Sequence, residues 1–280
     1  MSWVFFVLIG AVFNSLKNTL TRRIGGTIDV YTVALVSNLL MLPVLWLGAL
    51  LFNEATIDPT FWKLLLVMLP FEILVMLLFF KALTSSRLSY SFPFVSFMPV
   101  FVALGAFFIL GEVVHPMMYL GAGVVVTGAF LMNINQNTPR ADLRGVMYML
   151  MVAALWGYLA PMGKLAVTYA SPQLYPAVYF TLATLLFLPI FYFKHTTPLK
   201  EVAKRGGIFV VIGISFALFT MSNWYAYAQG PATGVAALVQ LAVPLTALMG
   251  IFMHKEGFSW RRLAGIVIMT IGAITVVLHR

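Results

Sequence analysis

The chain has 280 residues, of which 62% are hydrophobic and 9% are charged, with a formal net charge of +9 and no cysteine. Because soluble domains carry about a quarter charged residues, this composition excludes a soluble globular protein and indicates an integral membrane protein. The lack of cysteine excludes disulfides, thiolate metal sites and cysteine catalysis. The basic residues lie in short loops and form no contiguous stripe, so nucleic acid is not an expected partner.

Apolar stretches recur from one end of the chain to the other. Each has about 18 to 24 residues, enough to cross roughly 30 Å of hydrocarbon as a helix. The pattern predicts ten transmembrane helices, near 3–21, 30–51, 61–83, 90–111, 116–133, 145–166, 173–193, 207–228, 234–253 and 261–278. The first begins at Trp3 without a basic leader or a small-residue cleavage site, so we expect a retained helix and not a signal peptide.

Lysine and arginine gather on one side of the predicted membrane. Thirteen of them fall on the side opposite the N-terminus, and both termini are therefore predicted to be extracytoplasmic. These thirteen are Arg22, Arg23, Lys81, Arg87, Arg140, Arg144, Lys194, Lys200, Lys204, Arg205, Lys255, Arg261 and Arg262. Lys63, Lys164 and Arg280 fall on the other side. Lys164, near the end of its span, is expected to extend to the lipid headgroups. The lack of long tails fits a plasma (inner) membrane.

One helical pattern occurs twice, 144 residues apart. Pro99 is followed by an apolar run and a Leu-Gly-Glu sequence that ends at Glu112, and Pro244 by an apolar run and a His-Lys-Glu sequence that ends at Glu256. Such duplication within an apolar chain is typical of transporters built from internal repeats, whose site lies at the repeat interface.

A pair of glycines follows each glutamate at the same spacing. Gly121 and Gly128 in the first copy match Gly265 and Gly272 in the second. The two glycines of each pair lie on the same face of their helix, because they are seven residues apart. Five helices per repeat is an odd number, so the second copy should be inverted in the membrane. We predict a first repeat over 1–133, a polar linker over 134–144 and a second repeat over 145–280.

This duplicated unit is similar to the EamA-type units of the drug/metabolite transporter superfamily. Trp156-Gly157 resembles the Trp-Gly opening of such a unit, whereas the first span has Phe13-Asn14 there, and His254-Lys255 replaces the expected Leu-Gly. The resemblance covers nearly the whole chain. It implies an all-α membrane fold of ten helices in two inverted five-helix repeats around a central cavity, which moves small solutes by alternating access. Glu112 and Glu256 are expected to fix the turns of this scaffold.

Two ionisable side chains fall inside predicted spans. Glu72 lies near the centre of the third, where a charge costs roughly 2.5–3.5 kcal/mol, so it should face protein or water and bind a cationic group or a proton. Lys17 shares one helix face with Asn14 and Asn18. Lys17 and Glu72 lie about 21 Å and about 17 Å from the outer starts of their helices, a similar depth that permits an ion pair. The alternatives are a neutral, packed Glu72 and a Lys17 that extends to the cytoplasmic headgroups.

Further polar or amphipathic side chains within the spans are candidate substrate contacts. They are Asn38, Ser96, Trp156, Tyr158, Asn223, Tyr227 and Gln240. Ser96 and Gln240 lie one turn before Pro99 and Pro244, and a proline leaves a backbone carbonyl unpaired, so we expect hinges that line a cavity there. For each polar residue an interhelical hydrogen bond is the alternative role.

The chain has no His-Glu-x-x-His, Gly-x-x-x-x-Gly-Lys-Ser/Thr or Gly-x-Ser-x-Gly motif. We therefore expect no enzyme, catalytic residue, metal or cofactor, and no ATP-driven transport. The sequence predicts a secondary transporter of a small polar or zwitterionic, amino-acid-like solute, with Asn14, Lys17 and Asn18 engaging an anionic group and Glu72 a cationic group or a coupling proton. A multidrug or toxic-cation exporter and a translocase of lipid-linked substrates are the alternatives.

Overall fold

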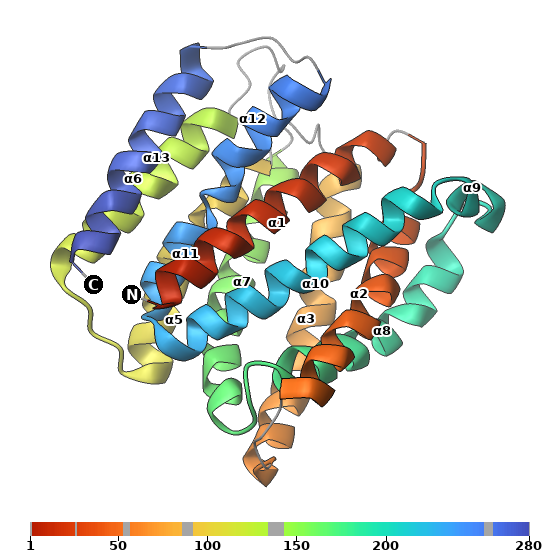
Figure 1. Ribbon diagram of the computed structural model, residues 1–280, viewed down its shortest axis with the longest axis horizontal. Helices are drawn as coiled ribbons and strands as arrows, with labels where there is room; N and C mark the ends of the chain where they lie inside the picture. Colours follow the sequence, from red (N-terminus) through yellow and green to blue (C-terminus); the bar gives the residue numbers. More distant parts are fainter. Residues whose placement is uncertain are drawn as a thin grey trace.

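The computed structural model describes residues 2–25, 27–52, 57–85, 92–133, 143–254 and 260–279, and these residues are almost entirely helical (Figure 1). The long helices are α1 (Ser2–Ile24), α2 (Val30–Phe52), α3 (Pro59–Ser85), α7 (Leu143–Thr168), α8 (Leu174–Lys194) and α10 (Gly206–Gln229). The shorter helices are η1 (Phe92–Phe97), α5 (Met98–Leu110), α6 (Pro116–Asn133), α9 (Leu199–Lys204), α11 (Ala232–Val239), α12 (Ala242–His254) and α13 (Trp260–Leu278). Glu256 and most of the predicted linker 134–144 lie outside the described residues.

The apolar sequence accounts for this architecture. Within the described chain, 7 helical stretches are long and apolar enough to cross a membrane, and shorter apolar helices cover 94–110, 116–132 and 263–278. In hydrocarbon no water is present to bond backbone N–H and C=O groups, so an apolar segment satisfies them within its own helix. The protein is a multi-pass helical membrane protein, as predicted, and each predicted span falls on one helix or on two consecutive helices.

Two of the predicted spans are interrupted. The fourth consists of η1, a 3₁₀ helix, followed by α5, and the ninth consists of α11 and α12. Pro99 is the second residue of α5 and Pro244 the third residue of α12. The structure goes beyond the predicted bends, since a new helix starts at each proline. The first turn of a helix does not need the missing proline N–H, whereas a helix interior does. Ser96 and Gln240 lie at the two interruptions.

Helices α6 and α13 pack on each other through glycine. A Cβ on Gly121 would lie 2.9 Å from the carbonyl oxygen of Gly272, and a Cβ on Gly272 would lie 2.7 Å from that of Gly121. In the same way, a Cβ on Gly128 would lie 2.9 Å from the carbonyl oxygen of Gly265, and a Cβ on Gly265 would lie 2.9 Å from that of Gly128. This pairing makes the two helices antiparallel, and it brings their backbones together as small residues do in membrane helix pairs. We call these four residues the α6–α13 seam.

The bundle has two ends that differ in chemistry. Helix α1 begins where Trp3 covers Gly230, beside Glu112, and it ends at Ile24, which packs with Phe209 of α10 near the loop that holds Asp29. We call these the Glu112 end and the Asp29 end. The largest fully buried side chains include Tyr175, Tyr227 and Phe61.

Helices α1 and α3, which carry the two predicted intramembrane charges, have different neighbours. Helix α1 packs along α10 and against α12, whereas α3 packs along α7 and against α8 (Figure 1). Helix α2 contacts both α8 and α10. Lys17 and Glu72 are therefore carried by separate parts of the bundle.

Candidate functional site

Glu72 lies in the middle of α3, two residues after Pro70, and its partner comes from α8. The hydroxyl of Tyr179 donates a hydrogen bond to Glu72 Oε2 at 2.8 Å. This bond joins the first half of the chain to the second, because Tyr179 follows Glu72 by 107 residues. A carboxylate with a single hydroxyl donor retains capacity for a further donor or a cation.

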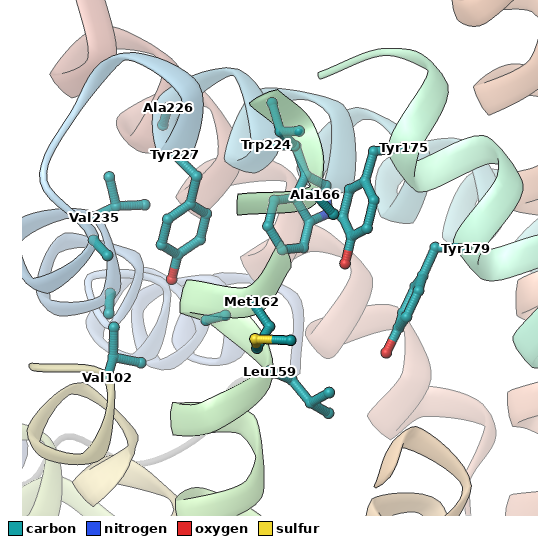
Figure 2. Close-up of a cluster of buried hydrophobic side chains, with 14 of the residues drawn as sticks. Val102, Leu159, Met162, Ala166, Tyr175, Tyr179, Trp224, Ala226, Tyr227 and Val235 are labelled. Atoms are coloured by element: carbon teal, nitrogen blue, oxygen red, sulfur yellow. The ribbon is translucent and has the colours of Figure 1, made fainter. Parts of the chain in front are cut away.

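A cluster of buried aromatic side chains adjoins Tyr179 (Figure 2). The ring of Tyr175 stacks on Tyr179 with 5.4 Å between centroids, Trp224 meets Tyr175 edge-on at 4.6 Å, and Tyr227 lies 5.2 Å from Trp224. The hydroxyls of Tyr175, Tyr179 and Tyr227 point in a similar direction in Figure 2. The Tyr175 hydroxyl is buried without a hydrogen-bond partner in the described part of the chain. A Cβ on Gly163 would overlap Trp224 and this hydroxyl, so glycine makes room for the cluster.

Sequence reasoning identified Tyr227 but missed Tyr175, Tyr179 and Trp224. The spacing i, i+4 places Tyr175 and Tyr179 on one face of α8, and this was the available signal. With 24 Phe and 11 Tyr in the chain, such pairs are too frequent to stand out.

Lys17 lies on aromatic rings of α10. Its Nζ is 4.5 Å from the centroid of Phe216 and 5.6 Å from that of Phe219, within the range of a cation–π contact. Phe216 lies ten residues into α10, about 15 Å from the Asp29 end, while the Lys17 backbone is about 10 Å from that end. The contact that the structure describes for the ammonium is therefore aromatic, near the middle of α10, and headgroup contact stays an alternative prediction.

The predicted proximity of Lys17 and Glu72 does not produce an ion pair. Neither side chain takes part in an ion pair within the part of the chain that the structure describes. The prediction used depth along each helix, and equal depth does not make two helices neighbours. Lys17 and Glu72 thus lie in separate parts of the bundle, each against aromatic side chains and without an ion-pair partner among the described residues.

The other candidate residues fall into four groups. Asn14 and Asn18 are half-buried on the Lys17 face of α1, and Asn38 is buried in α2. Trp156 and Tyr158 of α7 contact α3, through Phe79 at 6.1 Å and Phe71 at 5.4 Å between ring centroids. Asn223 precedes Trp224 in α10, and its Oδ1 is buried without a partner among the described residues. Ser96 is buried and Gln240 half-buried at the helix interruptions.

The Glu112 end is held by an ion pair. Lys164 Nζ lies 3.0 Å from Glu112 Oε2 and donates a second bond to the carbonyl oxygen of Gly230 at 2.7 Å. Lys164 thus joins α7 to the α5–α6 connection and to the end of α10, and its predicted extension to the headgroups is wrong. Gly111, with φ of 63°, takes the left-handed conformation that ends α5 and directs Glu112 toward Lys164. We call Lys164, Glu112 and the Gly230 carbonyl group the Lys164 clasp.

The Asp29 end is held by one carboxylate. Asp29 Oδ1 accepts from the Thr32 backbone N–H at 2.9 Å, which caps α2, and Oδ2 accepts from Thr197 N–H at 2.9 Å and Thr196 N–H at 3.2 Å. Partial burial opposes ionisation of Asp29, but these bonds and those of the Thr32 and Thr197 side chains outweigh it and lower the pKa. Asp29 therefore binds the α1–α2 loop to the loop before α9 as an anion.

A depression of about 560 Å³ opens beside the Lys164 clasp. Its lining residues come from the α5–α6 connection, the start of α11 and the end of α13, and they are Val113, Val114, His115, Met118, Pro231, Leu278 and His279. The rings of His115 and His279 stack with 5.3 Å between centroids. Within the described residues no group of three or more His, Asp or Glu side chains gathers where a metal ion could bind.

Comparison with known proteins identifies the scaffold. The model of the EamA-like transporter family matches the chain twice, over residues 1–134 and 143–278. A solved structure described as "Crystal structure of protein" has a TM-score of 0.79 with this chain, at 15% sequence identity and over 98% of each chain. At this identity the likeness shows the fold alone. No match is found among the curated proteins.

Proposed function

Because the chain belongs to the EamA-like transporter family, part of the drug/metabolite transporter superfamily, we propose that it is a secondary transporter that moves a small polar or zwitterionic organic solute by alternating access. Ten transmembrane helices in two inverted repeats, 1–133 and 145–280, would rock around a central cavity, joined by the linker 134–144. Transport and not catalysis is the activity of this family.

The α6–α13 seam supports the inverted repeat. Gly121 contacts Gly272 while Gly128 contacts Gly265, and each residue of the first helix has its counterpart 144 positions later in the second. Reciprocal pairing of equivalent positions is what a two-fold axis between inverted copies produces. The axis would pass through the seam, which would then serve as the pivot of the two halves.

The observation that carries the proposal is that Lys17 and Glu72, two ionisable side chains of opposite sign, have no ion-pair partner among the described residues. Lys17 Nζ rests on the Phe216 ring, and the Glu72 carboxylate has the Tyr179 hydroxyl as its described partner. Charges inside a membrane are costly, so unpaired ones mark substrate or ion pathways. Lys17, with Asn14 and Asn18, would engage an anionic group of the solute, and Glu72 a cationic group or a coupling proton.

The Lys164 clasp supports closure at one end of the pathway. It ties Glu112 of the first half to Lys164 and Gly230 of the second, and Trp3 covers the same glycine. The enrichment of basic residues at the Asp29 end makes the Glu112 end extracytoplasmic, as are both termini in this proposal. The clasp would open in the outward-facing state, while the helix interruptions at Pro99 and Pro244 would act as hinges.

Transport and binding by two variants test the roles of the charges. Lys17→Ala and Glu72→Gln should each lower uptake into proteoliposomes and abolish the thermal stabilisation that a bound solute confers. Lys63→Ala, at an exposed position, and Glu201→Gln, whose side chain is 47% exposed, are the matched controls and should behave as wild type. Wild-type rates in both site variants would remove Lys17 and Glu72 from the mechanism.

Orientation can be tested by cysteine labelling, because the chain has no native cysteine. A membrane-impermeant maleimide should label Val113→Cys on intact cells, and Lys200→Cys after permeabilisation alone. Both positions are exposed. The reverse pattern would place the Asp29 end outside.

Export of toxic organic cations is a second candidate, favoured by the aromatic cluster beside Glu72. Tyr175, Tyr179 and Trp224 provide the ring surfaces that bind lipophilic cations. Expression should then protect cells against such cations, and Glu72→Gln should remove the protection. Lack of protection across a panel of cations would count against this function.

A further inference from the structure

A continuous series of aromatic contacts connects the two intramembrane charges. Lys17 Nζ lies 4.5 Å from the Phe216 centroid, Phe216 lies 5.9 Å from Phe180, and Phe180 lies 5.4 Å from Tyr179, whose hydroxyl bonds to Glu72 at 2.8 Å. The series crosses from α1 to α10, then to α8 and finally to α3. Two ring-to-ring contacts, Phe216 with Phe180 and Phe180 with Tyr179, thus separate Lys17 from the hydroxyl that donates to Glu72.

The middle of this series is apolar and partly accessible. Phe180 and Phe216 are half-buried, and they meet at an interplanar angle of 68°. Phe219 extends the same surface, with its ring stacked near Phe216 at 17°. An apolar segment placed against these rings would exchange contacts with water for contacts with carbon.

Each end of the series has capacity for a group of opposite charge. The Lys17 ammonium has a ring face as its described contact, and it can donate up to three hydrogen bonds. At the other end the Tyr179 hydroxyl donates a hydrogen bond to Glu72 Oε2, whereas Glu72 Oε1 has no hydrogen-bond partner among the described residues. The Lys17 end thus suits a carboxylate, and the Glu72 end an ammonium.

We propose that the solute is an extended zwitterion, with its carboxylate and its ammonium at opposite ends of an apolar segment that lies along Phe216 and Phe180. This inference rests on the proposed role of Lys17 and Glu72 as the solute site. In an α-amino acid both charged groups are attached to one carbon atom, so it cannot engage both ends of the series at once. An extended chain advances about 3.5 Å for every three bonds, so several methylene groups are needed to pass two ring contacts.

A length series of ω-amino acids tests the spacing. Binding to the purified protein would be measured for β-alanine, γ-aminobutyrate, ε-aminocaproate and ω-aminooctanoate, with leucine and phenylalanine as α-amino acids. Affinity should rise with the number of methylene groups, and ε-aminocaproate or ω-aminooctanoate should bind at least about tenfold more tightly than leucine, a difference of about 1.4 kcal/mol. Phe216→Leu should weaken the long members most, whereas Phe108→Leu, at an exposed position of α5, should not.

Compounds that lack one charge identify which end binds which group. Wild type should prefer ε-aminocaproate to hexylamine and to hexanoate. Lys17→Ala should lose the preference over hexylamine and keep that over hexanoate, and Glu72→Gln should do the opposite. Lys17→Arg, which keeps the cation, should retain binding of ε-aminocaproate, and the preference over hexanoate that Lys17→Ala keeps would show that this variant is folded.

The outcomes separate this inference from the proposed function. If leucine binds as tightly as ε-aminocaproate, and loses binding in both Lys17→Ala and Glu72→Gln, then the site is correct and the extended solute is wrong. If no zwitterion of any length binds, both the inference and the assignment of the site are wrong.

Discussion

The two ends of the bundle join the same two halves of the chain by different chemistry. At the Glu112 end the joint is an ion pair, Lys164 with Glu112, supported by one carbonyl oxygen. At the Asp29 end a single carboxylate accepts bonds from neutral donors of Thr196 and Thr197. An ion pair depends on two charges and is screened by salt, whereas Asp29 depends on its own charge alone.

This difference in chemistry predicts which solution condition, salt or acid, weakens the joint at each end. Salt should loosen the Lys164 clasp and leave the Asp29 joint intact, because the partners of Asp29 carry no charge. Acid should release Asp29 once its carboxylate is protonated. In an alternating-access cycle the two joints would open at different times, and salt examines the Lys164 clasp without disturbing the Asp29 joint.

The largest effect is expected at the α6–α13 seam, which lies apart from both joints. Gly128→Ala would place a Cβ 2.9 Å from the Gly265 carbonyl oxygen and 2.9 Å from the Met269 backbone nitrogen. Because these are backbone atoms, the helices must separate, and the free energy of unfolding should fall by about 3 kcal/mol. Thermal unfolding in nanodiscs measures this loss.

Gly123→Ala is the matched control for the seam. Gly123 lies on the same helix, and a Cβ there meets nothing within 4 Å. Its melting temperature should equal or exceed that of wild type, since alanine has the higher helix propensity. Equal losses at Gly123 and Gly128 would show that the seam is not a close backbone contact.

The next largest effect is expected from Lys164→Met. The substitution keeps the length of the side chain but leaves the Glu112 carboxylate, which is 14% exposed, without its cation. The free energy of unfolding should fall by about 2 kcal/mol, because a mostly buried charge is left unpaired. Val113→Cys should also become more reactive toward maleimide as the Glu112 end opens.

A double-mutant cycle with Glu112→Gln isolates the ion pair. The coupling energy between the two substitutions should be about 1 kcal/mol and should shrink as ionic strength is raised. Coupling that salt does not change would mean that the clasp acts through the Gly230 carbonyl and not through charge.

These sites also show what a sequence can and cannot predict. Hydropathy predicted the membrane helices, because backbone groups in hydrocarbon must form their hydrogen bonds within a helix. The equal spacing of the glycines in the two copies indicated the positions, such as Gly121 and Gly272, that lie in close contact. The partners of charged residues were not predictable. Lys164 bonds to residues 52 and 66 positions away, and Glu72 to one 107 positions away. Depth along a helix can be calculated from sequence, but helix adjacency depends on tertiary packing.

Asp29→Asn should destabilise the protein in a pH-dependent way. The folded-state pKa of Asp29 is lowered below the unfolded value of about 3.9, so its contribution is complete above that value and is lost as pH falls through the folded pKa. At pH 7 the variant should be about 1–2 kcal/mol less stable than wild type, and the difference should narrow below pH of about 4. Melting curves across pH measure this.

Asp58→Asn is the control for that profile. Asp58 accepts a hydrogen bond from the Thr60 N–H at 2.7 Å and is exposed. Bonds from the Thr60 side chain and backbone lower its pKa, but no bond from its carboxylate to the other half of the chain is described. Asparagine is equally suited to cap a helix and Asp58 is exposed, so the variant should differ from wild type by much less than Asp29→Asn does at pH 7. A pH profile like that of Asp29→Asn would assign the acid effect to helix capping.

The smallest effect is expected from Thr197→Val, which removes the side-chain hydroxyl of Thr197 from the Asp29 joint and leaves its backbone N–H. The Thr197 hydroxyl accepts a bond from the Asp29 backbone N–H at 2.9 Å, whereas the Thr197 N–H donates to the carboxylate. Valine removes the first bond and keeps the second, so the loss should be about 1 kcal/mol at most. Because the Thr197 side chain also helps to lower the pKa of Asp29, this loss should be larger at pH 7 than below pH of about 4. If the loss instead were the same at both pH values, the hydroxyl would be acting through its bond with the Asp29 backbone N–H alone and not through the carboxylate.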